Sequence, residues 1–510
     1  MTDASLEFAL SPDDLSRLVK LPFLTRISRT TAVTTLWHDT PNGALAARCL
    51  SLSEQRGHWR LEALRPMPAR PWPPGSPAPL IAEGASLASL HHSLSDGLTP
   101  VAALRGRRME FVLRPPSAGV PKPDSDAANA NATLSAPSEA EPATAEPVRV
   151  TVLDGQARGV AAEQPACRML LRGDAALLRP AAMELAGAVR LSVPRAGLAA
   201  FAVAVARGNE PLPRHEGPPS TMPGLTTSDS VAMLIGQLLD TMLHWSVGAG
   251  AGVTPVPVHQ MRVATRRLRS ALAIFKRVAP FPELATLNAA LRDTATRLGA
   301  ARDWDVFLGD TAERVAAAFP DDGRVRSLLS AAGRRRQAAY IEIRAYLASP
   351  AFRELEVALA CASVLRPWDR EGTPDPRLHQ DTAVFAGMAL AHQTKRVRHT
   401  GRDLTALPLA ALHELRKDCK RLRYTAEFFL PLFPDKPARR FIKHLAALQE
   451  ELGMHNDGAT AAGLMAHLGR AERSYAAGLV EGFVAAGTVA SRAQVGRAWK
   501  RFRKTAPFWT

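Results

Sequence analysis

The chain has 510 residues, of which 46% are hydrophobic, and this is enough material for two domain cores. Its formal net charge of +16 favours a polyanionic partner but says nothing about the fold. No run of residues reaches the roughly 20 apolar positions of a membrane span. The four cysteines are isolated, so they give no paired spacing for zinc or redox chemistry. Because Asp3 and Glu7 stand where a signal peptide is basic, we expect a soluble, cytoplasmic protein with no membrane partner, no metal and no cofactor.

Alternating apolar and polar residues predict antiparallel strands in the first part of the chain. Strands are expected around Thr31–Trp37, Ala47–Ser53, Trp59–Leu64 and Met109–Leu113, and helices at Pro12–Lys20 and Pro194–Ala206. Turn-forming Asn-Gly, Arg-Gly and proline-rich breaks separate the predicted strands. Residues 1–210 are therefore expected to form an antiparallel β domain with some helix.

Two segments are rich in residues that break regular structure. Residues 115–148 are dominated by Pro, Ala, Ser, Asn and acidic residues and contain no aromatic residue, which predicts a disordered loop. Residues 211–225 also contain many breakers and are expected to form an interdomain linker.

The remaining residues, 226–510, carry one basic helical pattern twice. Residues 258–275 and 412–429 match at an offset of 154 residues, and both lack proline and glycine. Leu298-Gly299 and Leu452-Gly453 match at the same offset. Two blocks that agree at one offset indicate a duplicated unit. The two repeats are expected to span about 226–375 and 380–510.

Within each copy, four cations share one face of the predicted helix. The first ladder is His259, Arg262, Arg266 and Arg269, and the second ladder is His413, Arg416, Lys420 and Arg423. Both follow the i, i+3, i+7, i+10 spacing of a helix face, and Arg267 and Arg421 lie beside them. Like charges at i, i+4 repel by about 0.2–0.5 kcal/mol, yet the first copy has no acidic residue between Val258 and Pro280. The ladders therefore favour anion binding over a solvated helix face, and whether the two histidines titrate or only hydrogen-bond at the helix entry stays open.

The charge of the chain is concentrated in the part that carries the repeat. Residues 1–225 contain 23 basic and 21 acidic residues, for a net charge of +2, whereas residues 226–510 contain 41 and 27, for +14. Most of these cations are arginines, whose planar guanidinium binds phosphate oxygens in pairs. Further basic contacts are expected at Lys395, Arg396, Arg398 and Arg501, with ordinary solubilising charge as the equal alternative.

The two ladders, together with Leu298–Asp305 and Leu448–Gly453, resemble the CHAD family, the conserved histidine α-helical domain. The resemblance covers roughly residues 226–510. It implies an all-α domain of two pseudo-symmetric helical bundles and a basic groove for inorganic polyphosphate. By this resemblance, the ladder residues line one shared groove. It also suggests association with polyphosphate granules in a bacterial cell.

The first part of the chain resembles the CYTH family of triphosphate tunnel enzymes, through Leu6–Pro12, Trp37–Pro41 and Arg56–Trp59. That family holds a metal with an E-x-E-x-K strand, and the matching positions here are Asp3, Ser5 and Glu7. Where the family repeats arginine on a strand, this chain has Ser51 and Ser53. A metal that bridges phosphates needs several convergent carboxylates. We therefore expect a degenerate tunnel domain with no catalytic residues and no metal.

Together these expectations describe an α+β protein of two domains, a β tunnel or barrel-like domain followed by an all-α domain, that binds polyphosphate and is not an enzyme. Two alternatives stay open. One is hydrolysis of triphosphate or short polyphosphate by the first domain, and the other is nonspecific binding of nucleic acid. The second is less favoured because few aromatic residues accompany the ladders for base stacking. Oligomeric state and preferred chain length do not follow from the sequence.

Overall fold

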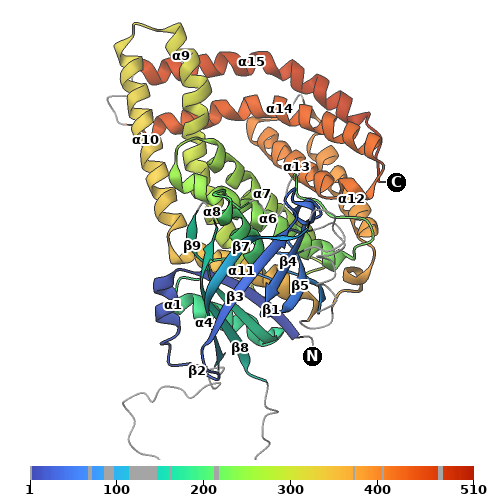
Figure 1. Ribbon diagram of the computed structural model, residues 1–510. Coiled ribbons are helices and arrows are strands. Elements are labelled where there is room, and N and C mark those ends of the chain that lie inside the picture. Colours follow the sequence, from blue (N-terminus) through green and yellow to red (C-terminus); the bar gives the residue numbers. More distant parts are fainter. Residues whose placement is uncertain are drawn as a thin grey trace, which may run out of the picture.

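The computed structural model describes residues 3–66, 72–84, 97–113, 146–159, 162–211, 217–370, 374–404, 407–468 and 475–509. Figure 1 shows a curled sheet from the first part of the chain and a helical part from the remainder. The predicted disordered loop at 115–148 lies almost wholly outside the described residues. The fold class expected from the sequence, a β domain that precedes a mostly helical region, is confirmed.

The sheet of the described residues is antiparallel, with strand order β1-β10-β8-β7-β3-β4-β5-β6, while β2 pairs with β7 and β9 with β8. Its strands are β1 (Asp3–Leu10), β2 (Leu24–Arg26), β3 (Thr31–Asp39), β4 (Leu50–Gln55), β5 (His58–Ala63), β6 (Leu80–Glu83), β7 (Thr99–Leu113), β8 (Val148–Arg158), β9 (Glu163–Pro165) and β10 (Cys167–Asp174). Because β1 pairs with β10, the start of the chain lies at one edge of the sheet and β6 at the other.

The predicted strand at Ala47–Ser53 is wrong in its first residues. Ala47 ends a short helix, α2 (Ala44–Ala47), and β4 starts only at Leu50. The carboxylate of Asp39 accepts hydrogen bonds from the backbone N–H groups of Leu45, at 2.8 Å, and of residue 46, at 3.1 Å. These bonds satisfy donors that a helix start leaves free, so a side chain far back in the chain fixes this turn of helix.

The two predicted helices of this part are confirmed with shorter bounds, as α1 (Pro12–Leu18) and α5 (Leu198–Ala206). Another helix, α4 (Ala175–Ala188), was not predicted, and it contains a proline in its first turns. The α4 helix packs on the convex face of the sheet, where Leu178 and Leu185 are fully buried.

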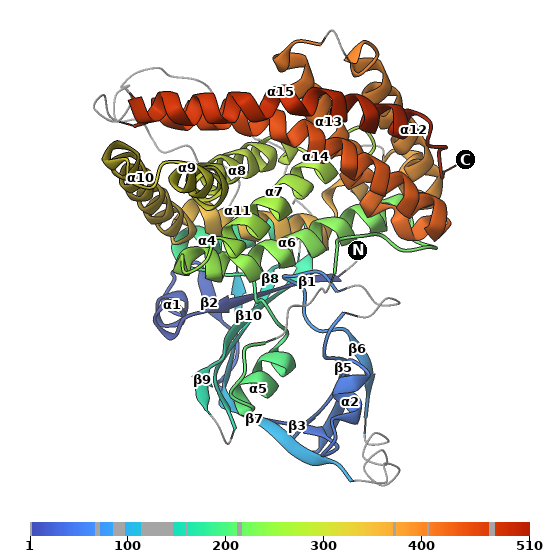
Figure 2. The same ribbon diagram turned by 90° about the horizontal axis from the view of Figure 1, so that it is seen from above.

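The concave face of the sheet is partly filled by α5, which lies inside the curl in Figure 2. Its alanine and valine side chains pack against Trp37, Leu104 and Ala157 of three strands. Side chains alternate between the two faces of a strand. The even-numbered residues of β7 that follow Leu104, such as Arg108 and Glu110, therefore face the remaining part of the same hollow.

Ten α-helices are described in the second part of the chain. They are α6 (Thr227–Ala251), α7 (Val256–Phe275), α8 (Leu284–Val306), α9 (Ala312–Ala318), α10 (Gly323–Leu347), α11 (Pro350–Leu365), α12 (Thr382–Thr400), α13 (Leu409–Phe428), α14 (Asp435–Ala466) and α15 (Tyr475–Arg503). Helices α6, α7 and α8 pack in chain order, and so do α12, α13 and α14. No described helix is both long enough and apolar enough to span a bilayer.

The two copies of the basic pattern lie on α7 and α13, and both helices are amphipathic as predicted. Helix α7 buries Met261 and Leu268 completely, and α13 buries Leu415, Cys419 and Leu422 completely. These residues of α7 belong to one hydrophobic cluster and these residues of α13 to another, while Phe428 at the end of α13 joins the first cluster. Each helix buries an apolar stripe, which leaves its opposite face to the cations.

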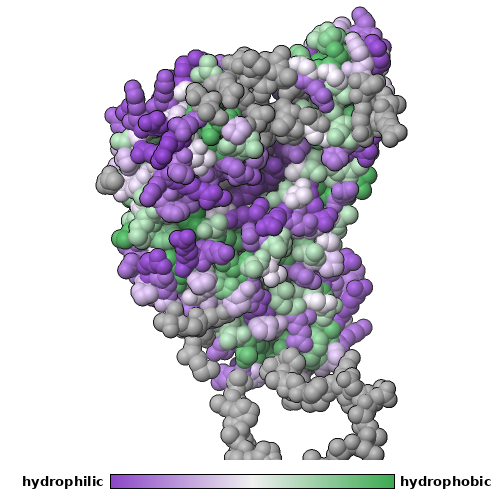
Figure 3. Space-filling view, turned by 180° about the vertical axis from the view of Figure 1, so that it is seen from behind, coloured by the Kyte–Doolittle hydropathy of each residue, from purple (hydrophilic) through white to green (hydrophobic). Residues whose placement is uncertain are grey.

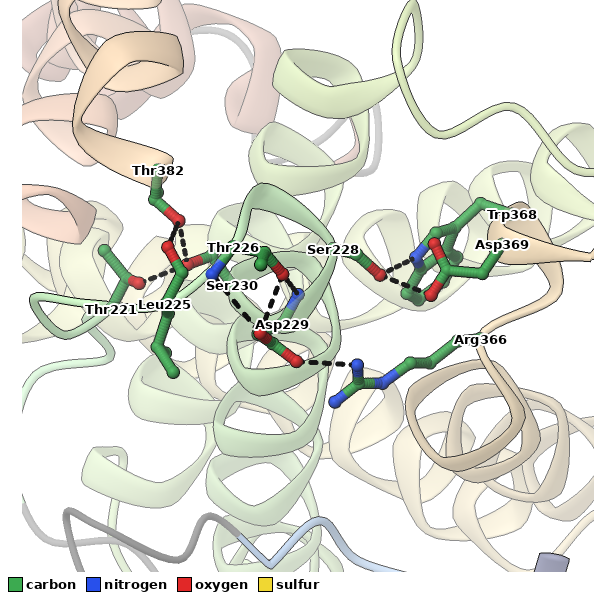
Figure 4. Close-up of polar contacts among 10 residues, drawn as sticks. All are labelled: Thr221, Leu225, Thr226, Ser228, Asp229, Ser230, Arg366, Trp368, Asp369 and Thr382. Carbon is green, nitrogen blue, oxygen red and sulfur yellow. Dashed lines mark hydrogen bonds and ion pairs between the residues drawn. The ribbon is translucent and has the colours of Figure 1, made fainter. Parts of the chain in front are cut away.

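A polar network joins the start of α6 to both copies (Figure 4). Thr226 and Asp229 form a capping box at the start of this helix. Asp229 also accepts a hydrogen bond from Arg366, which follows α11, at 2.7 Å. Thr382 at the start of α12 donates a hydrogen bond to the backbone oxygen of Leu225 at 2.8 Å. The network fixes the entry to the first copy against the entry to the second.

The helical part packs directly on the sheet. One hydrophobic cluster contains Leu6 of β1 and Leu178 of α4 together with Leu238 of α6 and Leu359 of α11. The described end of the predicted linker is also packed, because Thr221 is fully buried and its backbone N–H donates to the carbonyl oxygen of residue 428 at 2.9 Å. The last residues of the predicted linker thus contact the helical part.

Candidate anion-binding site

The ladder residues occupy the face of each helix opposite its buried stripe. His259, Arg262, Arg266 and Arg269 on α7 are half-buried, as are Arg416, Lys420 and Arg423 on α13, whereas His413 is exposed. The cations therefore sit partly out of water but within reach of a solute. Seen from behind, hydrophilic side chains surround a hollow in the helical part of the molecule (Figure 3).

Cations crowd one another along the first ladder. Burial, followed by the positive charges of Arg302, Arg262 and Arg266, lowers the pKa of His259 below its ordinary value. The pKa of Arg262 is also lowered, by burial and then by Arg266, although the carboxylate of Asp303 partly offsets this. Concentrated positive charge of this kind costs free energy in the empty protein, and a bound anion would relieve it.

Two members of this group were not predicted as site residues. Arg302 acts on both His259 and Arg262, and Arg292 acts on Arg269, whose pKa burial and these charges lower. Both extra arginines lie on α8, so the first site is built from two helices. Arg302 lies in the block after Leu298-Gly299, but the second copy has Asn456 at the corresponding position, so the repeat did not mark it as a site residue.

The repeated glycines have a structural role next to the ladders. A methyl group added at Gly299 of α8 would lie 3.6 Å from the Nε atom of Arg262. One added at Gly453 of α14 would lie 3.6 Å from an Nη atom of Arg416. A glycine therefore lies beside the same rung in both copies. A side chain larger than a methyl group at either position would reach the guanidinium.

The two ladder helices meet at Glu427 of α13. Its carboxylate accepts a hydrogen bond from Arg267 of α7 at 2.5 Å and one from Arg423 of its own helix at 2.7 Å. The Arg267 guanidinium also lies over the ring of Tyr424, 5.4 Å from its centroid. Helices α7 and α13 are thus joined through Glu427, whereas one groove shared by both ladders stays a prediction. Glu427 itself was missed, because it lies beyond the last predicted rung.

A second acidic residue, Asp418, pairs with two more of the predicted basic residues. The buried carboxylate of Asp418 lies 2.8 Å from Arg396 and 3.2 Å from Arg421, and it also accepts a hydrogen bond from Thr400. Arg396 and Arg421 are therefore ion-paired on the α12 side of α13. Lys395, Arg398 and Arg501 are exposed, and Arg501 lies near enough to His444 to lower its pKa, after burial and Arg440.

Some donors of the first ladder have no partner in the described parts of the chain. The Nδ1 atom of His259 and the Nε atom of Arg262 are buried without a hydrogen bond to any described residue. An unmade hydrogen bond at a buried charged group is expensive. The side chains of Asn456 and Asp457, which follow the second glycine motif, lie outside the described residues. The Nε atom of Arg262 is therefore a donor that a bound anion could satisfy.

The concave face of the sheet carries charges of both signs. A cavity of about 620 Å³ is lined by Arg60, Arg108 and Arg172, but also by Glu83 and Glu110. Arg60 lies 3.6 Å from Glu62 and 3.8 Å from Glu83, and burial raises the pKa of Glu62. This hollow is therefore close to neutral, unlike the ladders.

The strand that corresponds to the metal-binding strand of the CYTH family is β1, and none of its residues lines this cavity. Glu7 lies 3.4 Å from Arg168 and is paired with it, while Ser5 stands beside Arg172 in the register. Ser51 and Ser53 are buried on β4. Among the described residues, no three His, Cys, Asp or Glu side chains come together in a group that could hold a metal ion.

Comparison with known proteins identifies the helical part. Residues 234–466 match the CHAD domain family. The crystal structure of the CHAD domain from the plant Ricinus communis is 29% identical, with a TM-score of 0.51, and the match covers 57% of this chain and 96% of that one. PptA from Streptomyces chartreusis, at 15% identity, has a TM-score of 0.43 over 54% of this chain and all of that chain.

Among curated proteins, uncharacterised proteins from two strains of Mycobacterium tuberculosis are 32% identical over 219 residues. That match covers 42% of this chain and 40% of each relative, so the chain spans less than half the length of the relatives it matches. The N-terminal half-barrel is consistent with a CYTH-like tunnel fold. Residues 234–466 of this chain, with both ladder helices, are a CHAD domain.

Proposed function

We propose that this protein binds inorganic polyphosphate along the two ladders of its CHAD domain. The observation that carries the proposal is the crowding at His259, where burial and the positive charges of Arg302, Arg262 and Arg266 lower the pKa of the imidazole while its Nδ1 atom is left without a described partner. A chain of phosphates would supply the missing negative charge at regular spacing, and guanidinium groups bind such oxygens in pairs. The presence of the domain agrees with the proposal, since CHAD domains are linked to polyphosphate binding in general.

The two copies support binding of one long polyanion. Gly299 and Gly453 lie next to equivalent rungs, and Glu427 joins α7 to α13. A polyanion that follows both ladders would neutralise many cations at once. Its affinity would then fall steeply with salt, by a log–log slope of about −0.7 for each neutralised phosphate, if polyphosphate behaves as single-stranded nucleic acid does.

The experiment is a titration of the full chain with long-chain polyphosphate at low and at near-physiological salt. Binding that survives the higher salt supports the proposal. Single-stranded DNA is then added at equal phosphate concentration as a competitor. If DNA displaces polyphosphate equally well, the site is a general polyanion surface, and the nucleic-acid alternative replaces this proposal.

Association with polyphosphate granules follows as the cellular part of the same proposal. A fluorescent fusion of the full chain should gather on granules in a bacterial cell that makes polyphosphate, and it should spread when synthesis is blocked. An unchanged pattern in cells without polyphosphate would contradict it.

Hydrolysis in the concave hollow is not favoured. Its arginines are balanced by glutamates, and the apolar helix α5 fills part of the face. The test is phosphate release from tripolyphosphate by the full chain with Mg²⁺ or Mn²⁺. Release that disappears when Arg60 and Arg172 are both replaced by alanine would assign an enzymatic activity to this half.

A further inference from the structure

The two ladders are not equivalent, and one difference is a carboxylate beside the last rung of the second ladder. Glu427 stands four residues after Arg423, the last rung of the second ladder, and is bonded to it at 2.7 Å. At the offset of 154 residues, the position that corresponds to Glu427 in the first copy is Ala273, which is exposed. The last rung of the first ladder, Arg269, bonds instead to the neutral side chain of Asn288, at 3.3 Å.

Glu427 also reaches the other copy. Its second oxygen accepts the hydrogen bond from Arg267 of α7, so one negative charge is shared by two arginines from the two ladder helices. The side chains of Arg267, Arg423 and Glu427 are 18%, 37% and 14% exposed, which leaves the group within reach of a solute but shields it from bulk water. Electrostatic interactions are stronger in such a place than on an open surface.

The geometry of this group is that of an arginine pair on a bound phosphate. A carboxylate with two oxygens accepts from two guanidinium groups, as a phosphate group of the polyanion would. A phosphate that approached the same arginines would meet the negative charge of Glu427. The arginines would have to give up these bonds or share them.

We infer that Glu427 acts as an internal competitor of the polyanion at the junction of the two ladders, an inference that rests on the proposed function. In the empty protein its carboxylate takes the place of a phosphate between Arg267 and Arg423. It therefore weakens polyphosphate binding by the second ladder relative to the first, and it limits the total affinity for polyphosphate. A long polyphosphate chain would then be held mainly by the first ladder, around His259 and Arg262, and less tightly where the ladders meet.

The test measures long-chain polyphosphate binding by the full chain for wild type and three variants. Glu427→Gln keeps the size of the side chain and one acceptor oxygen but removes the charge. We expect it to bind about fivefold more tightly, the factor for one unit charge at about 4 Å in a water-like medium. The slope of log affinity against log salt should steepen by about 0.7 for each further phosphate that the freed arginines neutralise.

Ala273→Glu is the reciprocal variant. It places an acid four residues after Arg269, at an exposed position that does not touch the Glu427 pair, and it should weaken binding several-fold. Asp435→Asn is the matched control, because Asp435 forms an i,i+4 pair with Arg439 on α14, in which both side chains are about two-thirds exposed. It should change the affinity little. Melting curves of all variants check that each is folded at the temperature of the titration.

The outcomes separate this inference from the proposed function. Tighter binding by Glu427→Gln, with weaker binding by Ala273→Glu, supports the competitor. If Glu427→Gln binds equally or more weakly while wild type binds well, Glu427 positions the arginines for the ligand and the inference is overturned, but the proposed function stands. The same tightening in Asp435→Asn would reduce the effect to net charge and also overturn it. If wild type and all variants fail to bind polyphosphate, both the inference and the proposed function fall.

Discussion

Each half of this protein has a surface with several arginines, but the two halves differ in how far acidic residues neutralise that positive charge. In the curled sheet, Arg60 lies within 4 Å of two glutamates and Arg168 lies 3.4 Å from Glu7. Around His259 in the helical half, the charges that act most strongly on the imidazole are those of other arginines. The number of arginines alone therefore does not identify an anion-binding site. Such a site is identified by positive charge that the acidic side chains of the protein do not neutralise.

Support of the two surfaces differs as well. The hollow of the sheet is partly filled by the apolar side chains of α5. The ladders lie on two long helices, each of which buries an apolar stripe. A rigid helix can keep a row of cations at fixed spacing, which suits a repeating polyanion. The half-barrel, which is consistent with a CYTH-like tunnel fold, has charges of both signs on its concave face.

The largest effect is expected from removing one equivalent rung in each ladder. Arg262→Ala with Arg416→Ala should lower polyphosphate affinity about 100-fold, since each lost charged hydrogen bond costs roughly 1.5 kcal/mol. Isothermal titration calorimetry of the full chain measures this loss. The control is Arg377→Ala with Arg439→Ala, which removes the same charge from two exposed, locally ion-paired positions. An equal loss in the control would break the comparison, because total charge alone would then explain binding.

The second expected effect is on the pH dependence of stability, through a buried carboxyl at the boundary between the two halves. Glu356 of α11 is buried, and burial raises its pKa to about 8, although Arg353 and Arg195 act in the opposite direction. A carboxyl whose pKa is raised on folding binds its proton more tightly in the folded chain. Its contribution to stability is therefore complete below the ordinary value of 4.5 and is lost as pH rises through about 8.

The stability of Glu356→Gln relative to wild type should consequently increase with pH, by about 2 kcal/mol between pH 6 and 8. The two proteins should be nearly equal only near pH 4, where the carboxyl is protonated in both the folded and the unfolded wild-type chain. Urea unfolding at each pH gives the comparison. Equal stability at every pH would show that Glu356 is solvated and that the halves are less tightly packed than described.

A smaller loss of affinity is expected when the room beside a ladder rung is filled. Gly299→Leu should weaken polyphosphate binding about tenfold, or by about 1.4 kcal/mol, because the added side chain would displace the guanidinium of Arg262 without any change of charge. Gly333→Leu on α10, where nothing lies within 4 Å of an added methyl group, is the control. Unchanged binding by Gly299→Leu would mean that the position of the rung does not matter and that charge alone does.

The smallest effect is that of pH on His259. Because burial and three arginines lower its pKa, the imidazole should be neutral in the free protein at pH 7. The unfolded chain binds this proton more tightly, so His259 should reduce stability as pH falls below 6.5. In NMR titrations, saturating polyphosphate should raise its pKa. A pKa at or above 6.5 in the free protein would contradict the described crowding of cations.

Much of the helical half could be predicted from the sequence. The helical spacing of apolar residues such as Met261 and Leu268, on the face opposite the cations, predicted the amphipathic helices. The constant offset of 154 residues between matching segments predicted two copies. The glycines of the repeat were visible but their role was not, since it depends on which arginine of the neighbouring helix they face. Glu427 was missed for a similar reason. Its contact with Arg267 joins residues 160 positions apart, and local spacing carries no information about it.

The sheet was harder to predict. Four strands and two helices could be located from alternation and breakers, but not the helix α4, which contains Pro180. The short helix α2 replaced the start of a predicted strand because Asp39 caps it from six and seven residues away. The balance of charge in the hollow depends on strand register, which places Arg60 opposite Ser53 and beside Glu62 and Glu83. Register follows from pairing between strands, not from the pattern within one.

The most direct test of the central claim is whether both ladders hold one polyphosphate chain. The full protein is titrated calorimetrically with long-chain polyphosphate, alongside the single variants Arg262→Ala and Arg416→Ala. One binding event that each variant weakens is the predicted result. Two separate events, each abolished by only one of the variants, would contradict a shared site and show two independent surfaces.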